Sequence, residues 1–493
     1  MIVKISALII YVLILFAIGI VASKRIKNIS DFYVGGKKIG YWAVAFSARA
    51  TGESGWLLIG LTGMGAMAGL SAYWVVVGEV LGVALSWFFM AKPFKRLSDR
   101  YQSITIPDFL ESHFKTSQPF LRAISATILS VFVVIYVSSQ IDATGIAFES
   151  MLGLNYFYGA ILGFLIVLAY IFVGGYVAVV WSDLFQGFLM FLGLVALPIV
   201  VYFSISHHES IYTQLHQIDP YLTHIWGGSD NTWLNVATIL GFSMIGLGFL
   251  GSPQVYVRFM SIKNEAEINK GRWVAVIFTF LTDAAAVTIG VLARVIFTES
   301  GQNAEGILGV GGADVLGLMT EKFLPLALTA IYIAIVLSAI MSTIDSLLVL
   351  ASSAVTRDFY QKIFRPKLAD ASLTKTSRWV TLIMAFLALG IAMLIAITSP
   401  ERQVFWVIIF GWSGIAASFC PVIILAIFWK AYNAAGAIAS MITGFLSVAL
   451  FKFVFQELPT YGVYFEKIDV LFPSFVLAML VGVLVSKIYK SPA

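Results

Sequence analysis

Five polar side chains lie close together in residues 323–355, a stretch rich in Ile, Leu and Ala. They are Ser338, Ser342, Thr343, Asp345 and Ser346. The three serines recur at every fourth position, so a helix would place them on one face. Their hydroxyl oxygens suit a hard cation, which prefers oxygen ligands. The alternative is that each hydroxyl bonds the carbonyl four residues earlier in its own helix, as serine and threonine do in membrane helices.

A second stretch, residues 41–68, is long enough to span a membrane but is interrupted near its middle. Residues 50–56 read ATGESGW, with two glycines, one charge and two hydroxyls. In hydrocarbon, unsatisfied backbone groups and buried charges each carry a large free-energy cost. We therefore expect the interruption to face a protein interior or a water-filled cavity. Broken helices at mid-membrane are the usual way in which secondary transporters build substrate and ion sites.

Arg49 directly precedes this interruption and is a cation within an apolar segment. It could capture a substrate carboxylate, or it could pair with Glu53, which lies four residues later on the same helix. Asp142 and Glu79 are other possible partners. A buried charge is rarely left unpaired, so we favour the ion pair between Arg49 and Glu53.

The composition predicts the elements that position these residues. The 493 residues are 60% hydrophobic and 12% charged, with a mean hydropathy of +0.93, whereas a soluble domain carries about 25% charged residues. We expect an all-α polytopic membrane protein that forms a single domain over 1–493. Thirteen segments can span a bilayer, each needing about 20 residues. They are 4–23, 41–68, 72–91, 120–149, 155–180, 182–204, 233–257, 273–298, 323–355, 377–398, 403–429, 434–455 and 468–487.

The charges between these segments predict the orientation. Most lysines and arginines fall in the stretches 24–38, 92–122, 258–272 and 357–378, and basic residues collect on the cytoplasmic face. The N-terminus is then outside and the C-terminus, after an odd number of spans, in the cytoplasm. The first apolar run lacks a cleavage site and reads as a spanning helix. We expect an integral protein of a bacterial cytoplasmic membrane.

Several runs resemble the sodium:solute symporter family, most closely its bacterial sodium/proline symporters. The matching runs are SGWLLIG (54–60), IPDF (106–109), VGG (173–175), WSD (181–183) with Gln186, Pro253 followed by RFM (258–260), and MST (341–343). The resemblance implies a LeuT-type fold with two inverted five-helix repeats, about 41–204 and 233–429. The helices 4–23, 434–455 and 468–487 would be additions to this core. It also implies alternating access driven by a sodium gradient.

The resemblance also implies where sodium binds. Carried onto this sequence, the ligands are the carbonyls of Ala50, Glu53 and Ala339 and the hydroxyls of Ser342 and Thr343. Some family members hold a second cation, and the matching residues here are Asp183, Ser342, Asp345 and Ser346. The alternative is that Asp183 caps a helix at the interface and that Asp345 pairs with a basic residue.

We expect the substrate beside the interruption, where free backbone amides favour a carboxylate. The candidates are Gly52, Ser54, Gly55, Trp56, Tyr136, Gln140 and Phe249. Three positions depart from the proline symporters, which carry Asp at position 52, Trp at 245 and Tyr at 249. Here these positions hold Gly52, Ile245 and Phe249. The pocket is therefore not a standard proline pocket, although proline or a related amino acid remains the leading hypothesis.

Two other functions compete with sodium symport. Protons could drive uptake through Glu53, Asp142 or Asp345, because burial can move the pKa of a carboxylate towards neutrality. An intramembrane enzyme would need a nucleophile–base pair or a metal cluster, but the sequence has no HExxH or GxSxG run and its histidines all lie in polar stretches. We expect no cofactor, with sodium as the coupling ion. The expected partners are a small solute, sodium and lipid, with no nucleic acid and no obligate protein.

Overall fold

A computed structural model describes residues 2–25, 28–116, 119–205, 210–368 and 373–489, with only the backbone for 170–174. Within these ranges all regular secondary structure is helical, and one isolated β-bridge joins Ile39 to Ile262. The longer helices are α1 (Ile2–Ser23), α3 (Tyr41–Gly55), α5 (Tyr73–Leu85), α6 (Ala91–Arg100), α8 (Phe120–Leu152), α9 (Tyr156–Ser204), α11 (Thr232–Met244), α13 (Glu265–Phe297), α16 (Leu326–Ser353), α17 (Leu373–Thr398), α18 (Val404–Phe428), α19 (Ala434–Leu450) and α21 (Leu471–Ile488).

Shorter helices connect or extend these. They are α2 (Ile29–Val34), η1 (Gly35–Lys37), η2 (Trp56–Leu61), α4 (Thr62–Ala68), η3 (Gly69–Ala72), η4 (Ser86–Met90), α7 (Ile106–Phe114), α10 (Ile211–Ile218), η5 (Pro220–Thr223), η6 (Ile245–Leu250), α12 (Pro253–Ser261), α14 (Ala304–Leu308), η7 (Val310–Gly312), α15 (Val315–Phe323), η8 (Ala354–Phe364), η10 (Phe451–Phe455) and α20 (Gly462–Ile468).

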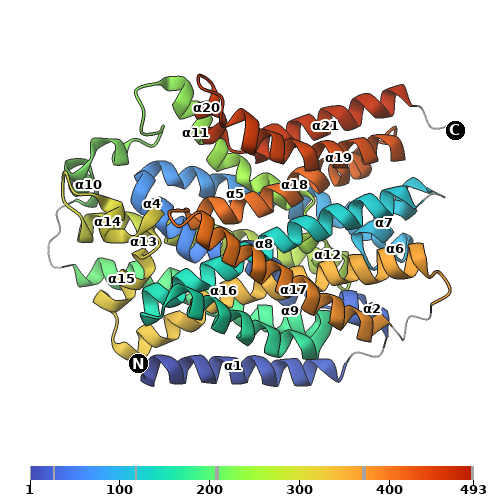
Figure 1. Cartoon of the computed structure of the whole chain (residues 1–493), viewed down its shortest axis with the longest axis horizontal. Helices are drawn as coiled ribbons and strands as arrows, with labels where there is room; N and C mark the ends of the chain where they lie inside the picture. The colour runs from blue at the N-terminus through green and yellow to red at the C-terminus, as the bar shows by residue number, and fades with distance from the viewer. Residues whose placement is uncertain (1, 26–27, 117–118, 206–209, 369–372, 490–493) are drawn as a thin grey trace.

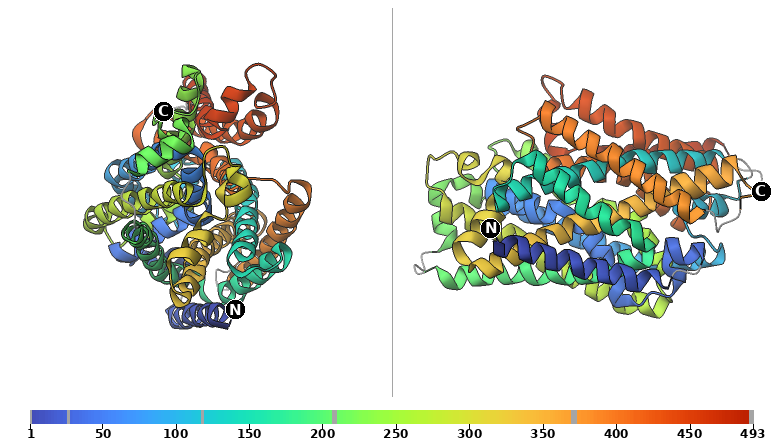
Figure 2. Two further views of the ribbon diagram at one scale, coloured as in Figure 1. Left: turned by 90° about the vertical axis from the view of Figure 1, so that its left-hand side faces the viewer. Right: turned by 60° about the horizontal axis from the view of Figure 1, so that its bottom comes forward.

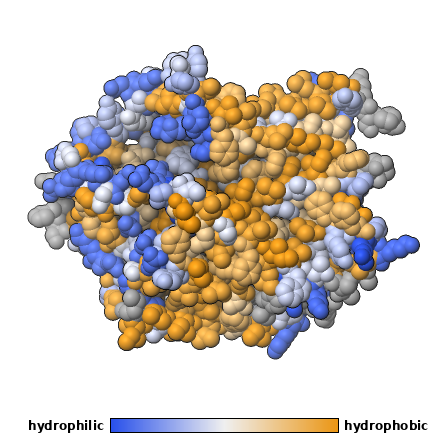
Figure 3. Space-filling model, viewed as in Figure 1, coloured by the Kyte–Doolittle hydropathy of each residue, from blue (hydrophilic) through white to orange (hydrophobic). Residues whose placement is uncertain are grey.

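The helices run along the long axis of the molecule, and an apolar belt separates two more polar ends (Figures 2 and 3). In the described residues, eleven helices are long and apolar enough to cross a membrane. One of them, Tyr41–Arg100, covers two predicted segments, and the shorter apolar helix Tyr156–Ala169 corresponds to another. Thirteen is therefore an approximate count. The start of α1 and the end of α21 lie at opposite ends of the bundle, as an odd number of spans requires (Figure 1).

One predicted boundary was wrong. The apolar pattern predicts a division between residues 180 and 182, but α9 (Tyr156–Ser204) is continuous there and bends at Gly175, which has φ 52° and ψ −170°. A glycine adopts this conformation without the steric cost of a Cβ atom. The second half of α9, Gly175–Ser204, is therefore 30 residues long. Asp183 lies two turns inside this half instead of at its beginning.

The core of the bundle is built around α16. The apolar stretch of this helix is 100% buried inside the protein, whereas the apolar stretch of α1 is 28% buried. Helix α16 packs against α3, α8 and α9. Helices α19 and α21 pack on each other at one edge and α1 covers the opposite edge (Figures 1 and 2). The hydroxyls of α16 therefore lie deep in the protein, away from lipid.

Small residues allow the second interrupted helix to approach its neighbour. Helix α11 passes into η6, and a Cβ atom built on Gly246 would lie 1.9 Å from the carbonyl oxygen of Gly78 in α5. A Cβ on Gly78 would in turn lie 2.0 Å from the carbonyl oxygen of Ser243. Glycines allow such close backbone packing between membrane helices. The two interrupted helices, α3–η2 and α11–η6, are those expected of two repeats, and the exact repeat boundaries stay a prediction.

Candidate functional site

The interruption in α3 centres on Ser54, which has φ 48° and ψ −166° and is fully buried. This conformation is costly for a residue with a side chain and persists only where the surroundings hold it. The Gly55 amide donates to Gln140 Oε1 at 2.9 Å, and the Trp56 indole donates to the Gly52 carbonyl at 2.9 Å. The π-helix η2 follows directly. Side chains thus replace part of the helical hydrogen bonding that the break removes.

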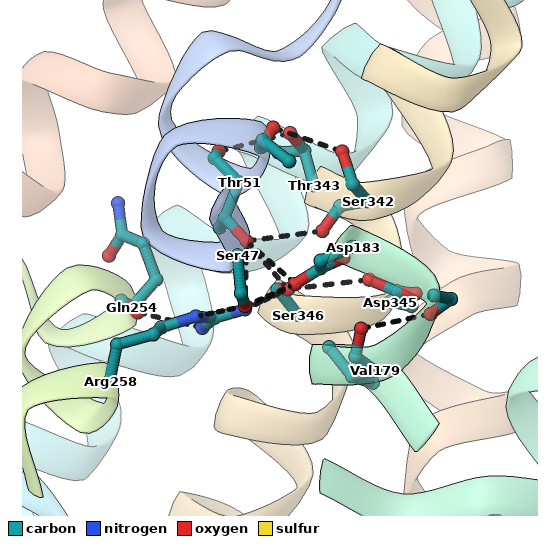
Figure 4. Close-up of polar contacts among 12 residues, drawn as sticks. Ser47, Thr51, Val179, Asp183, Gln254, Arg258, Ser342, Thr343, Asp345 and Ser346 are labelled. Atoms are coloured by element: carbon teal, nitrogen blue, oxygen red, sulfur yellow. Dashed lines mark hydrogen bonds and ion pairs between the residues drawn. The ribbon is translucent and has the colours of Figure 1, made fainter. Parts of the chain in front are cut away.

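Two hydroxyls of α16 lie against the carbonyls that precede this break (Figure 4). Ser342 Oγ is 2.9 Å from the Ala50 oxygen and 3.0 Å from the Ala339 oxygen. Thr343 Oγ1 is 3.0 Å from the Thr51 oxygen and 3.2 Å from the Ala339 oxygen. All these residues are buried. The result is a compact cluster of oxygen atoms that joins α3 to α16, and unwound carbonyls with hydroxyls are suitable sodium ligands.

Four of the five predicted sodium ligands, Ala50, Ala339, Ser342 and Thr343, meet in this cluster. The carbonyl of the fifth, Glu53, accepts a hydrogen bond from the Trp56 amide, so its place among the ligands stays a prediction. The carbonyl of Thr51 was missed, although it follows Ala50 directly. Ser338 bonds the Ala334 carbonyl at 2.7 Å, as the alternative interpretation of the hydroxyls held, and the bond from Thr343 to Ala339 also fits that alternative.

The residues of the expected second cation position also lie close together. They contact Arg258, a partner that we did not predict. Asp183 Oδ2 accepts from Ser47 Oγ at 2.6 Å and from Arg258 Nη2 at 3.1 Å. Ser346 Oγ contacts Arg258 Nη2 and lies 3.3 Å from Asp345 Oδ1. Asp183 is completely buried, so it does not cap a helix at an interface. The Ser342 hydroxyl points to the Ala50 carbonyl instead.

The predicted substrate residues surround the break and are all buried. A Cβ atom built on Gly52 would lie 2.8 Å from the ring of Phe249. Tyr136 donates to Ser54 Oγ at 3.4 Å. The ring of Trp56 points towards Phe405, with 6.1 Å between centroids. Gly55 and Gln140 are joined by the amide bond described above.

Trp412 in α18 was not among the predicted substrate residues, but it lies beside the rings of Phe249 and Tyr136. Its ring centroid is 5.0 Å from that of Phe249 and 6.4 Å from that of Tyr136. Its indole donates to the Ile245 carbonyl at 3.1 Å, where η6 begins. Nothing distinguishes it in the sequence from other aromatic residues of apolar segments, so no signal pointed to it.

Arg49 pairs with Glu53, as predicted. Glu79 Oε2 is 3.8 Å from Arg49 Nη2, and the guanidinium lies 4.5 Å from the centre of the Phe249 ring. Asp283 also interacts electrostatically with Arg49. Arg49 Nη1, Glu53 Oε2 and Gln140 Nε2 are buried and have no hydrogen-bond partner among the described residues. Donors and acceptors are therefore available beside the break for a zwitterionic solute.

Ion pairs close the bundle on both sides of this site. At one end, Asp142 of α8 binds Arg402 ahead of α18, with 2.9 Å between Nε and Oδ2, and accepts from Tyr156. At the other end, Asp108 of α7 pairs with Arg122 at 2.7 Å and with Arg357 at 3.0 Å. Burial raises the pKa of Asp108, but Arg357 and Arg122 outweigh it, so this pKa lies below its usual range. The deep site is thus closed from both ends.

Comparison with known proteins identifies the family. The family model for the sodium:solute symporter family matches residues 32–444. The chain belongs to the sodium:solute symporter family. This symporter is 32% identical over 452 residues to the high-affinity proline transporter PutP of Bacillus subtilis, which covers 90% of this chain and 92% of that relative. It is 32% identical over 492 residues to sodium/proline symporter 2 of Staphylococcus saprophyticus, with 98% and 93% covered.

A solved structure confirms the fold of this symporter. A sodium-coupled sialic acid symporter, in a substrate-bound outward-open state, superposes with a TM-score of 0.79 at 19% identity, covering 100% of this chain and 98% of that one. The predicted LeuT-type, all-helical fold is therefore confirmed. The family makes the protein a sodium-coupled membrane transporter of a small solute and not an enzyme.

Proposed function

We propose that this symporter imports proline, or a closely related zwitterionic amino acid, together with sodium. Relatives named as proline transporters match it over nearly their whole length. The observation that carries the coupling is the oxygen cluster that joins the broken helix α3 to α16 through Ser342 and Thr343. The site lies in an integral protein of a bacterial cytoplasmic membrane, with the N-terminus outside.

Sodium occupies this cluster between the carbonyls of Ala50 and Ala339 and the hydroxyls of Ser342 and Thr343. A carbonyl of Glu53 or Thr51 completes the ligand set when the break rearranges around the ion. The hydroxyls now donate to the carbonyls, and both kinds of oxygen turn their lone pairs to sodium on binding. The ion thereby ties the two helices together and stabilises the conformation of the break at Ser54.

The solute binds on the other side of the break. Its carboxylate accepts from Gln140 Nε2 and Arg49 Nη1, which have no partner among the described residues. Its apolar ring lies against Phe249, Trp412 and Tyr136, and its ammonium group faces Glu53. Gly52 leaves room for the ring of Phe249, and Gly55 leaves room for Gln140, while Trp56 holds the Gly52 carbonyl. The ligand groups thus differ from those of proline symporters that carry a carboxylate at position 52.

Coupling follows from this shared break. Sodium and solute both favour one shape of α3, so each raises the affinity for the other by the same factor. The loaded bundle then closes its outer end through Asp142 and Arg402. It opens its inner end, where Asp108 and Arg122 separate, and both ligands leave into the cytoplasm. One sodium entering at 100 mV supplies about 2.3 kcal/mol, before its concentration gradient is counted.

Uptake by the purified protein in proteoliposomes tests the proposal. Radiolabelled proline is offered under an inward sodium gradient, under an inward potassium gradient, and under a pH gradient without sodium. We expect accumulation only with sodium, competed by unlabelled proline and not by lysine. Sodium-driven uptake of another amino acid, without proline, would contradict the substrate and leave the coupling intact.

Proton coupling is the second candidate, because three buried carboxylates accompany one guanidinium near the break. Glu53 and Glu79 contact Arg49, and Asp283 interacts with it electrostatically. Excess buried negative charge requires a bound cation or a proton. Accumulation under the pH gradient without sodium would favour this candidate over sodium symport.

A further inference from the structure

A cavity of about 760 Å³ lies beside α8, next to the pair of Asp142 and Arg402 that closes one end of the bundle. Helix α8 packs against both α17 and α18 (Figure 1) and contributes Ile135 and Ser138 to the lining. The other walls come from α17, α18, η10 and the residues around α20. The volume falls in the range of roughly 300–1,000 Å³ that is typical of sites for drug-sized ligands. It is more than one proline molecule requires.

The lining becomes more polar along the axis of the bundle. On α17, which ends at Thr398, it includes Ile391 and Ile395, and just beyond the helix it includes Ser399 and Arg402. Apolar groups therefore line the part nearer the membrane centre, and polar groups line the part nearer the helix end. The same change from hydrocarbon to head group occurs along a lipid in a bilayer.

The cavity borders the apolar outer surface of the bundle. Phe453 of η10 lines it and is 67% exposed, and Leu394 and Ile397 of α17 are exposed beside it. Helix α17 packs on α8 and α16, whereas α19, which continues into η10, packs on α18 and α21. The two walls thus belong to different groups of helices, and a hydrocarbon chain can reach the space between them from the surrounding lipid.

Charges of both signs line the polar part of the cavity. The charged lining residues are Arg402, Lys452, Lys467, Glu466 and Asp469. Asp142 binds Arg402 from outside the lining, so this set holds three cations and three carboxylates. A balanced set of charges favours a zwitterionic ligand over a ligand with a net charge.

Asp469 supplies an acceptor that lacks a partner. The residue is 8% exposed, and its Oδ2 atom is buried without a hydrogen-bond partner among the described residues. Lys452 interacts with it electrostatically, but the Lys452 ammonium donates to Gln456 Oε1 at 3.0 Å. A buried carboxylate oxygen requires a donor. An ammonium group in the cavity would supply one, as a charge-assisted hydrogen bond.

We propose that this cavity binds a phospholipid with a zwitterionic head group, phosphatidylethanolamine, at the end of the bundle that the charge distribution places outside. The ammonium group donates to Asp469 Oδ2, and the phosphate lies beside Lys452 and Lys467. One acyl chain lies against Ile395. Because Arg402 lines the same cavity, the lipid contacts the pair that closes this end. The proposal goes beyond amino-acid import and does not rest on it.

Native mass spectrometry of the purified, delipidated full-length protein tests the proposal by counting bound lipids. The protein is offered phosphatidylethanolamine, phosphatidylcholine and phosphatidylglycerol with identical chains. We expect one phosphatidylethanolamine per chain, bound about tenfold more tightly than the other two. The methylated ammonium of phosphatidylcholine has no N–H to donate, and phosphatidylglycerol has no ammonium. Asp469→Asn should abolish this preference, and asparagine tolerates the positive φ of 58° at this position.

Two tryptophan variants locate the lipid. Ile395→Trp fills the cavity and should lose the bound phosphatidylethanolamine. Leu394→Trp is the matched control, because Leu394 is the preceding residue of the same helix but is exposed and does not line the cavity. Equal retention of the lipid by both variants would overturn the proposal. If Ile395→Trp does not fold, the head-group preference of the wild type and of Asp469→Asn decides.

Three further outcomes would also overturn the proposal. They are a wild type that retains no phosphatidylethanolamine, a wild type that holds all three lipids equally, and an unchanged preference in Asp469→Asn. Displacement of the lipid by excess proline would instead make the cavity a second solute site. The measurement needs neither sodium nor proline uptake, so a failure of the lipid site is distinguishable from a failure of the proposed function.

Discussion

The unusual residues beside the break in α3 contact one another. The ring of Phe249 occupies the space that a side chain at position 52 would need, since a Cβ there would lie 2.8 Å from it. The same ring lies under the Arg49 guanidinium at 4.5 Å, and Arg49 pairs with Glu53. The carboxylate beside the break is therefore that of Glu53, one residue after Gly52, and the Arg49 cation holds it.

Thr343→Ala removes one hydroxyl from the oxygen cluster and should weaken sodium binding. Hydrogen bonds or contacts to a charged group contribute about 1.5–3 kcal/mol, so we expect the apparent sodium affinity in proline uptake to fall roughly tenfold or more. Thr343→Ser should retain most of it. Ser352→Ala is the matched control, because Ser352 is buried in the same helix and, among the described residues, its hydroxyl bonds the Val349 carbonyl of its own helix. Equal effects at both positions would contradict the site.

Glu53→Gln should lower uptake more than Glu79→Gln, when both are compared at equal amounts of folded protein. Glu53 contacts Arg49 directly, whereas the Glu79 carboxylate is 3.8 Å away. Removing one partner of a buried ion pair costs about 3–5 kcal/mol because it leaves the other charge uncompensated. The measurement is the initial rate of sodium-driven proline uptake. Near-native rates in both variants would show that the pair is not needed.

At the scale of elements, two interrupted helices are held by different means. The break in α3 is held by side chains, namely Gln140 and the indole of Trp56. The break at η6 is held mainly by backbone packing, because Gly246 and Gly78 bring η6 and α5 into contact, with one side-chain hydrogen bond from Trp412 to the Ile245 carbonyl. The first arrangement can change when a ligand competes for the side chains. The second resists change, so η6 offers the firmer surface against which the solute is enclosed.

Gly246→Ala should therefore destabilise the protein. Its Cβ would lie 1.9 Å from the backbone oxygen of Gly78, which cannot move aside without shifting α5. Overpacking of this kind costs about 1–3 kcal/mol, and we expect a lower midpoint of thermal unfolding in detergent together with reduced uptake. Gly390→Ala is the matched control, since a Cβ on this helical glycine of α17 would meet nothing within 4 Å. A midpoint unchanged in both variants would contradict the packing argument.

At the scale of the whole molecule, the parts that could be predicted from the sequence are those marked by polar groups in apolar segments. The break at residues 50–56 and the hydroxyls of Ser342 and Thr343 were found in this way. The contacts of Arg258 could not be predicted, because its partners Ser47 and Asp183 lie 211 and 75 residues away in the sequence. Trp412 gave no local signal either. The count of spans was approximate because Tyr41–Arg100 continues through two of them.

The orientation of the bundle is a separate prediction that follows from the distribution of charge. The α12–α13 connection, which includes Lys263, should lie in the cytoplasm, and the connection ahead of α14, which includes Gln302, should lie outside. Both side chains are exposed. The native Cys420 is buried, so a cysteine introduced at either position can be labelled selectively.

In intact cells, a membrane-impermeant maleimide should label Gln302→Cys and leave Lys263→Cys unlabelled until the membrane is permeabilised. The unmodified protein, with Cys420 alone, gives the background. Labelling in the reverse order would place the N-terminus in the cytoplasm. The end that Asp108 and Arg122 close would then face outward, and the end that Asp142 and Arg402 close would face the cytoplasm. Sodium would have to reach the oxygen cluster past Asp108 and Arg122 during uptake.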